Sequence, residues 1–195
     1  MTTILRLARP DDAAAIRAIY APHVSDGSTS FELEVPDVPT MQGRVAKVQQ
    51  AGLPWLVAEE DAVVGYAYAS LHRERAAYRW SIETSVYLAP GARGRKLGSR
   101  LMRAVLAIVE LQGYRSALAG LTLPNPASLA LHQRLGFEEV GVYRDVGFKN
   151  GAWADVWWGQ RILGSPSAPA PPRPLEELDP SRVQGILALS EPNAE

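Results

Sequence analysis

The sequence predicts an α/β or α+β domain with a central sheet, followed by a proline-rich tail. Alternating or continuous apolar runs, typical of strands, are interleaved with segments whose apolar residues recur at helical spacing. The chain has 195 residues and 47% of them are hydrophobic, so one sizeable core can form. After Leu163 the composition shifts to proline, serine and alanine. We therefore expect a domain over residues 1–163 and a tail over residues 164–195 that is extended or lies on the domain surface.

The first third of the chain is expected to form one strand, two helices and a hairpin. An aspartate can cap the first helix, and Gly52 ends the second. In chain order we predict a strand at 4–7, a helix after Asp11 or Asp12, a loop at 22–39, a helix around 41–48, and hairpin strands at 55–59 and 63–68.

The rest of the domain alternates strands and helices around a basic glycine loop. An apolar stripe that begins at Leu97 and Leu101 marks the buried side of the helix after that loop. In chain order we predict a strand at 80–88, a turn at Pro90-Gly91, the loop, a helix ending at Gly113, a strand at 117–123, a short helix at 125–135, and strands at 139–148 and 155–162 joined by a turn at 149–151.

The basic loop is the strongest functional signal from the residues themselves. All charged residues between Glu83 and Glu110 are basic, namely Arg93, Arg95, Lys96, Arg100 and Arg103. A helix that starts after a glycine loop presents unpaired backbone N–H groups and a positive partial charge, which favour phosphate binding. Gly94 and Gly98 would allow a close approach. The loop matches neither a Walker A loop nor GxGxxG, so a solvated basic surface is the alternative interpretation.

Composition narrows the possible functions. The formal net charge of −1 argues against a general nucleic-acid binder. The absence of cysteine excludes disulfides, thiolate metal sites and a cysteine nucleophile. We expect no metal site, because His23, His72 and His132 lack metal-ligand spacing. No apolar run has the length of a signal peptide or a membrane span, so we expect a cytoplasmic protein.

Several segments resemble the GNAT-type N-acetyltransferase superfamily. Its motif, Arg/Gln-x-x-Gly-x-Gly/Ala after a strand, is similar to Arg93-Gly94-Arg95-Lys96-Leu97-Gly98, with Lys96 in place of the middle glycine. Four further segments resemble the phosphinothricin N-acetyltransferases: Tyr78-x-Trp80-x-x-Glu83-x-x-Val86-Tyr87, Leu123-Pro124-Asn125, His132-x-x-Leu135-Gly136, and Gly147-Phe148-Lys149-x-Gly151-x-Trp153-x-Asp155-Val156. The resemblance covers residues 3–174, including Pro171-Pro172-Arg173-Pro174 in the tail.

This resemblance implies a mixed, mostly antiparallel central sheet with helices on both faces, and acetyl-CoA as the acetyl donor. It implies that the strand before the loop bends and that its backbone amides hold the pantetheine arm, while the loop amides bind the pyrophosphate. The residues implied to bind the cofactor are Val86, Tyr87, Leu88, Arg93, Gly94, Arg95, Lys96, Leu97, Gly98, Ser99 and Asn125.

Acetyl transfer to an amine requires removal of a proton from the ammonium group, because amine pKa values lie above neutrality. Glu83 is the candidate general base, with a structural ion pair or a solvated strand edge as the alternatives. His132 lies on a predicted helix in a polar stripe with Asn125 and Ser128. It is a candidate proton relay or substrate contact, and a packed or surface histidine is the alternative. The backbone N–H of Tyr87 or Leu88 would stabilise the oxyanion of the reaction.

The resemblance also implies the acceptor class, an amino-acid analogue such as phosphinothricin or methionine sulfoximine, and with it a role in herbicide resistance. Two arginines near the catalytic strand can bind its anionic groups, although they can equally be solvated surface residues. The candidate substrate-binding residues are Phe31, Glu32, Arg73, Arg75 and Tyr78, with Trp80 as a further wall. Trp153, Trp157 and Trp158 are expected in the core or at a dimer surface.

The related enzymes imply a homodimer. Two other functions stay open: acetylation of protein N-termini or other amines, and acyl-CoA binding without turnover.

Overall fold

The chain folds around one seven-stranded sheet in the computed structural model, which describes residues 2–27, 29–164 and 170–189. In chain order the strands are β1 (Ile4–Leu7), β2 (Trp55–Glu59), β3 (Val63–Leu71), β4 (Ser81–Leu88), β5 (Ser116–Thr122), β6 (Glu138–Lys149) and β7 (Ala152–Ile162). Their order across the sheet is β1-β2-β3-β4-β5-β7-β6, and every neighbouring pair is antiparallel except β4 and β5. The predicted mixed, mostly antiparallel sheet is confirmed.

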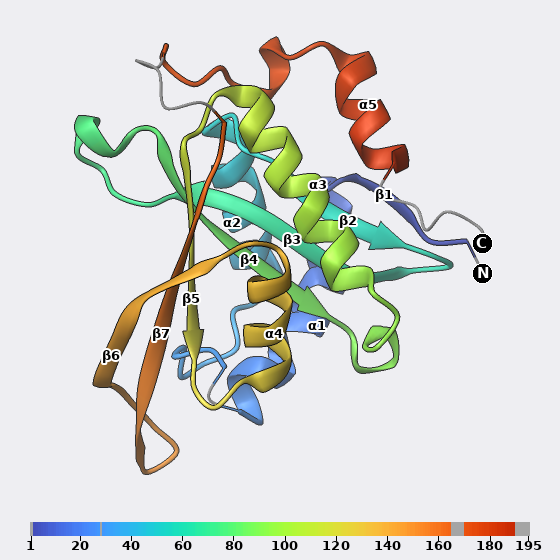
Figure 1. Ribbon diagram of the computed structural model, residues 1–195. Coiled ribbons are helices and arrows are strands. Elements are labelled where there is room, and N and C mark those ends of the chain that lie inside the picture. The colour runs from blue at the N-terminus through green and yellow to red at the C-terminus, as the bar shows by residue number, and fades with distance from the viewer. Residues whose placement is uncertain (1, 28, 165–169, 190–195) are drawn as a thin grey trace.

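Helices cover both faces of this sheet (Figure 1). Helices α1 (Ala13–Ser25) and α2 (Val38–Gln50) pack on one side, which we call the α1/α2 face. Helices α3 (Leu97–Gln112), α4 (Pro126–Arg134) and α5 (Pro180–Leu189) lie on the other side, the α3 face. Strand side chains alternate between two buried clusters: Val57 and Tyr66 lie under α1 and α2, whereas Leu56 and Ala67 lie under α3.

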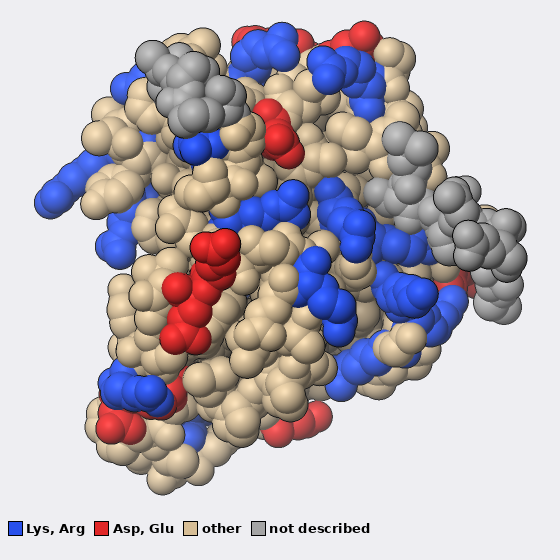
Figure 2. Space-filling view, in the orientation of Figure 1, with Lys and Arg blue, Asp and Glu red and all other residues tan. Residues whose placement is uncertain are grey.

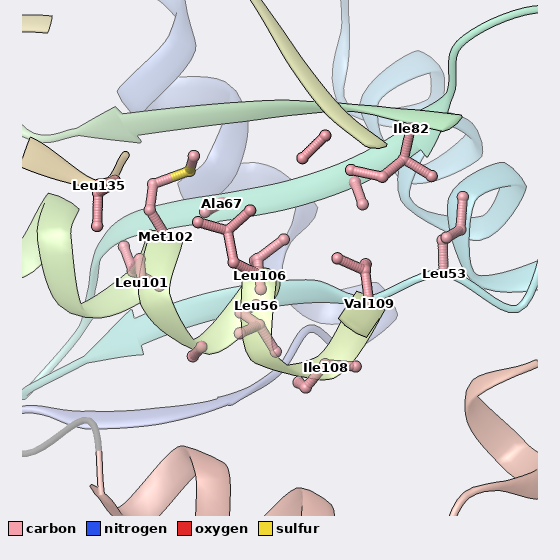
Figure 3. Packing of buried hydrophobic residues seen from close by; sticks show 14 of the residues in the cluster. Leu53, Leu56, Ala67, Ile82, Leu101, Met102, Leu106, Ile108, Val109 and Leu135 are labelled. Atoms are coloured by element: carbon pink, nitrogen blue, oxygen red, sulfur yellow. The ribbon is translucent and has the colours of Figure 1, made fainter. Parts of the chain in front are cut away.

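The larger cluster joins α3 to the centre of the sheet. Figure 3 shows Leu101, Met102 and Val109 of α3 pointing toward the strands. All three side chains have 0% exposure, as do Leu56 and Ile82 on the sheet. The apolar stripe predicted for this helix is therefore its buried side, and burial of that stripe is what holds the helix against the strands.

Local sequence signals fix most element boundaries. Asp37 caps α2 by accepting a hydrogen bond from the Thr40 N–H at 2.8 Å, and Asn125 caps α4 by accepting from the Ser128 N–H at 3.3 Å. Asn150 and Gly151 have φ values of 53° and 78°, which form the tight turn predicted between the last two strands.

The segment after Leu163 contains a helix that the sequence reading did not predict. Asp179 accepts a hydrogen bond from the Ser181 N–H at 2.8 Å and Pro180 is the first residue of α5, a common helix start. Leu178, Val183 and Leu187 are at most 7% exposed and belong to the same core cluster as α3. Residues 170–189 thus pack on the domain, while the parts of the predicted tail at 165–169 and 190–195 lie outside the described residues.

No helix within residues 2–27, 29–164 and 170–189 combines the length and the apolar character that a bilayer crossing requires.

Candidate active site

Strands β4 and β5 separate in the middle of the sheet. Their parallel pairing joins only Ser81–Glu83 to Ser116–Leu118, whereas β4 continues alongside β3 as far as Leu88. Beyond Leu118, β5 stays paired with β7. Glu83 and Leu118 therefore mark a branch point from which the two strands diverge, and a gap opens in the sheet toward the start of α3.

The register shows which backbone groups of β4 border this gap. The Ala89 N–H donates to Val64 O at 2.9 Å and the His72 N–H donates to Ser81 O at 3.3 Å. Odd-numbered residues of β4 thus direct their backbone groups toward β3, and even-numbered residues direct theirs toward β5. Val86 and Leu88 lie past the last β4–β5 pair, so their amides face the gap. The amide of Tyr87 faces β3, which favours Leu88 over Tyr87 as an oxyanion donor.

The glycine loop and two helices converge on the same gap. Gly94 and Lys96 have φ values of 76° and 61°, so the loop turns twice in the left-handed region before α3 begins at Leu97. A Cβ atom placed on Gly98 would lie 3.4 Å from Leu131 Cδ2 of α4 and 3.5 Å from Leu88 Cδ1 of β4. The unpaired amides at the α3 N-terminus therefore lie close to the end of β4 and to α4, which is a suitable geometry for a phosphate attached to an extended chain.

Basic side chains surround this region (Figure 2), where blue residues gather across the centre of the face that carries α3 and α4. Arg103, Arg134 and Arg161 line a groove between α3, the end of α4 and β7. Arg95 instead forms an ion pair with Glu60, which also accepts a hydrogen bond from Thr3 Oγ1 at 2.5 Å. The Arg95 side chain is thus engaged with a carboxylate, and its backbone amide is the group left for an anion.

Glu83 lies at the branch point with its side chain on the α1/α2 face, 36% exposed. Its Oε1 lies 2.7 Å from His72 Nδ1, and no hydrogen bond from the described residues reaches its Oε2. The His72 ring has its edge toward Tyr78 at 5.9 Å and toward Trp158 at 6.4 Å between ring centroids. A partly exposed carboxylate with one oxygen held in place is suited to accept a proton.

His132 is buried on the opposite side of the sheet, with 2% exposure. Its Nδ1 lies 2.8 Å from the backbone oxygen of Ser128 and its ring contacts Phe137 at 5.1 Å. Nδ1 therefore carries the proton, and the buried Nε2 accepts no hydrogen bond from any described residue. Burial lowers the pKa of His132, partly opposed by the hydrogen bond to Ser128. Among the described residues no hydrogen bond or ion pair joins His132 to Glu83, so the structure does not bring the two candidate catalytic residues together.

The predicted acceptor residues lie in two groups. Tyr78 and Arg73 lie beside His72, with Arg73 Nε 3.5 Å from His72 Nε2; Arg75 follows closely in the same exposed segment. Phe31 and Glu32 belong to the loop between α1 and α2.

Glu32 is part of a polar network rather than a free acidic group. Arg44 donates to both Glu32 oxygens, at 2.7 and 3.0 Å, and Tyr20 Oη donates at 3.0 Å. Burial opposes ionisation of Glu32, but the hydrogen bonds from Arg44 and Tyr20 outweigh it and lower its pKa. The orientation of the Glu32 carboxylate is thus fixed, and the positive charge of Arg44 compensates its negative charge.

Phe31 depends on two residues of strand β6. A Cβ atom on Gly147 would lie 2.3 Å from Phe31 Cζ, so only glycine allows the ring to lie there. Buried Lys149 donates to Val24 O at 2.6 Å and to Ser30 O at 2.8 Å, which ties the loop to the sheet. The resemblance pointed to Gly147 and Lys149 without assigning them this role.

Sequence reasoning missed two residues at the branch point. His72 was noted only for lacking metal-ligand spacing, although it lies on the same face of the hairpin as Glu83. Trp158 was expected in the core or at a dimer surface, but its ring covers Gly120, at 3.2 Å from a Cβ placed there, beside His72. The register of β3 against β4 places His72 beside Glu83. That register cannot be predicted from the sequence, because the connection between the two strands is long. Trp157, by contrast, is buried as expected, at 2% exposure.

Comparisons with known proteins agree with this geometry. The family model described as "Acetyltransferase (GNAT) domain" matches residues 5–158. A phosphinothricin N-acetyltransferase from Alcaligenes faecalis is 47% identical over 163 residues, which is 83% of each chain. An L-methionine sulfoximine/L-methionine sulfone acetyltransferase from Pseudomonas paraeruginosa is 34% identical over 173 residues, covering 88% of this chain and 100% of the relative.

A solved structure extends the match to three dimensions. The phosphinothricin acetyltransferase (Pat) of the GNAT superfamily from Sinorhizobium meliloti, in complex with AcCoA, superposes with a TM-score of 0.83 and 38% identity, covering 87% of this chain and 94% of that one. The diverging strands, the glycine loop at the start of α3 and these matches lead to one conclusion: the chain belongs to the GNAT family of acetyltransferases.

Proposed function

We propose that the protein transfers the acetyl group of acetyl-CoA to the amine of a small amino-acid analogue, with phosphinothricin or methionine sulfoximine as the favoured acceptor class. The observation that carries the proposal is the gap between β4 and β5, which opens toward the start of α3 and has Glu83 at its apex. The donor and acceptor sites can then meet from opposite faces of the sheet. The names of the related enzymes support the acceptor class.

The residues around the gap fit the donor. The Val86 and Leu88 amides can pair with the amide groups of a pantetheine arm as an additional strand would, and the amides from Arg93 to Ser99 can bind pyrophosphate. Asn125 keeps its side-chain NH₂ group for the same arm, because its oxygen caps α4. The groove lined by Arg103 and Arg134 can take a further phosphate.

Glu83 acts as the general base. The acceptor ammonium gives one proton to Glu83 Oε2, directly or through a water molecule, and the amine is left with a free electron pair. That pair forms the new C–N bond to the acetyl carbon, the C–S bond of the thioester breaks, and the sulfur departs with the bonding electrons. The nitrogen then loses its second proton, and the departing thiolate takes up a proton to become the thiol. His132 donates from Nδ1 to Ser128, so its Nε2 is a proton acceptor, and we assign to it the relay of that proton from nitrogen to sulfur.

Arg73 and Arg75 are proposed to bind the carboxylate and the second polar head of the acceptor, with Tyr78 and Phe31 as walls. Glu32 is proposed to set the charge balance of this pocket through its pair with Arg44. Acetylation of phosphinothricin would block its amine and confer resistance to that herbicide.

The protein is further proposed to be a cytoplasmic homodimer. Six large apolar side chains of the β6–β7 hairpin are at least 50% exposed, namely Val140, Tyr143, Val146, Phe148, Trp153 and Ile162. Phe148 and Trp153 are a cross-strand pair with ring centroids 5.2 Å apart, so they present one apolar surface. Replacing Trp153 with arginine should shift the mass measured by light scattering from dimer to monomer, and a wild-type protein that is monomeric at all concentrations would refute the proposal.

The decisive experiment measures thiol release from acetyl-CoA with phosphinothricin, methionine sulfoximine, ordinary amino acids and short peptides as acceptors. Saturable turnover with the first two alone supports the proposal. Turnover only with peptides would move the function to acetylation of protein N-termini. CoA binding without turnover on any acceptor would indicate a binding module.

A further inference from the structure

His72 and Glu83 form a diagonal pair at the loop end of the β3–β4 hairpin. Ser70 is paired with Glu83 in the register, and the His72 N–H bonds to Ser81, so His72 and Glu83 project from the same face. Such diagonal neighbours lie about 7–8 Å apart between Cα atoms, and only long side chains bridge them. Here the side chains do so, with 2.7 Å between His72 Nδ1 and Glu83 Oε1.

The surroundings hold the His72 ring in this orientation. Its side chain is 13% exposed, and its ring is near the rings of both Tyr78 and Trp158. An ionised carboxylate only accepts hydrogen bonds, so Nδ1 carries the proton and donates the hydrogen bond to Glu83. Arg73 Nε approaches Nε2 at 3.5 Å, which agrees with Nε2 being the unprotonated nitrogen.

We propose that His72 is a positioning residue for the acetyl-transfer reaction: it fixes the Glu83 carboxylate by one oxygen so that Oε2 faces the acceptor amine. The inference rests on the proposed role of Glu83 as the general base. A glutamate at 36% exposure without this contact would populate several rotamers, and only some of them would meet the amine. The arrangement is a carboxylate–imidazole pair in which the carboxylate is the reacting group and the imidazole orients it.

The test compares four single variants and one double variant in steady-state kinetics in which acetyl-CoA and the acceptor are each varied. His72→Leu removes both ring nitrogens at similar volume, and His72→Asn keeps an N–H donor near the Nδ1 position. Ser70→Ala is the matched control, because Ser70 is the direct cross-strand partner of Glu83 and its side chain makes no hydrogen bond to the Glu83 carboxylate. Glu83→Gln, alone and combined with His72→Leu, shows whether His72 acts through Glu83.

We expect His72→Leu to lower kcat about tenfold, equal to about 1.4 kcal/mol of activation free energy, with the KM for acetyl-CoA unchanged. His72→Asn should recover kcat to within about threefold of wild type, and Ser70→Ala should match wild type. Adding His72→Leu to Glu83→Gln should change the residual rate less than about twofold. If His72→Leu does not fold, His72→Gln replaces it, because its amide reaches the Nε2 position and not the Nδ1 position.

A wild-type kcat in His72→Leu, or a full tenfold further loss in the double variant, would overturn the inference. Failure of the proposed function looks different. In that case the wild-type protein would not acetylate small amines, or Glu83→Gln would keep full activity whatever residue 72 is.

Discussion

Replacing Lys96 with glycine should stabilise the protein, although Lys96 lies on the surface. Lys96 precedes the first residue of α3 and has φ 61° and ψ 6°, with no hydrogen bond from its side chain to cap the helix. A residue with a Cβ atom costs about 1–2 kcal/mol in this left-handed region, whereas glycine occupies it freely. The family motif has glycine at this position, so the substitution also restores the family pattern.

The net gain is smaller than the strain, because glycine loses more backbone entropy on folding. Subtracting about 0.5–1 kcal/mol for that entropy leaves a stabilisation of about 0.5–1 kcal/mol, or about 2 °C in Tm for a chain of this size. Urea denaturation of wild type, Lys96→Gly and Lys96→Ala measures it. Alanine keeps the Cβ atom and removes the charge, so it should be no more stable than wild type.

Equal unfolding free energies for the glycine and alanine variants would refute the argument from backbone strain. The same two variants test the lysine charge, because both remove it. If that charge contributes to phosphate binding, the Kd for CoA should rise in both variants by about two- to fivefold at low salt, the range of an exposed ion pair. A rise in the glycine variant alone would show that the backbone conformation, not the charge, governs binding.

Three further predictions concern other parts of the molecule. Burial lowers the pKa of His132 below its unfolded value of about 6.5, so protonation of this residue favours unfolding. As the pH falls from 7.5 to 5.5, His132 should therefore lower the free energy of unfolding by at most about 1.4 kcal/mol. Urea titrations at both pH values measure this loss, and His132→Gln should remove it. Gly98→Ala should fold normally because its Cβ makes ordinary contacts, whereas Gly98→Leu should block the gap between β4 and α4 and abolish CoA binding in calorimetry without unfolding the protein. Leu187→Ala should lower the unfolding free energy by about 2–4 kcal/mol, because Leu187 is 5% exposed in the core; a change below 0.5 kcal/mol, roughly what a surface residue gives, would contradict that placement.

The fold class could be read from the chain because its signals are local. The stripe of α3, the helix start at Asn125 and the turn at Asn150 each depend on residues a few positions apart, so each could be predicted as a pattern. Reliance on local signals also explains why helix α5 was not predicted. The many prolines around it dominate the local composition and indicate an extended tail.

The same distinction applies to the candidate site: its local features could be predicted from the sequence, and its long-range contacts could not. The glycine loop and Glu83 were found from spacing and resemblance, because a strand, a loop and a helix start follow one another in the chain. That Lys96 adopts a left-handed conformation and that Arg95 pairs with Glu60 could not be found this way. Both depend on how the loop settles against residues far away in the sequence.

The family, the pattern of strands and helices and the position of the basic glycine loop could thus be inferred from the chain alone. The pairing of Glu83 with His72 and the burial of His132 on the other side of the sheet became clear only from the folded chain. Both depend on the register of β3 against β4 and on the point where β4 leaves β5, which are set by packing of the whole sheet between two layers of helices. That packing cannot be inferred from a residue's neighbours along the chain.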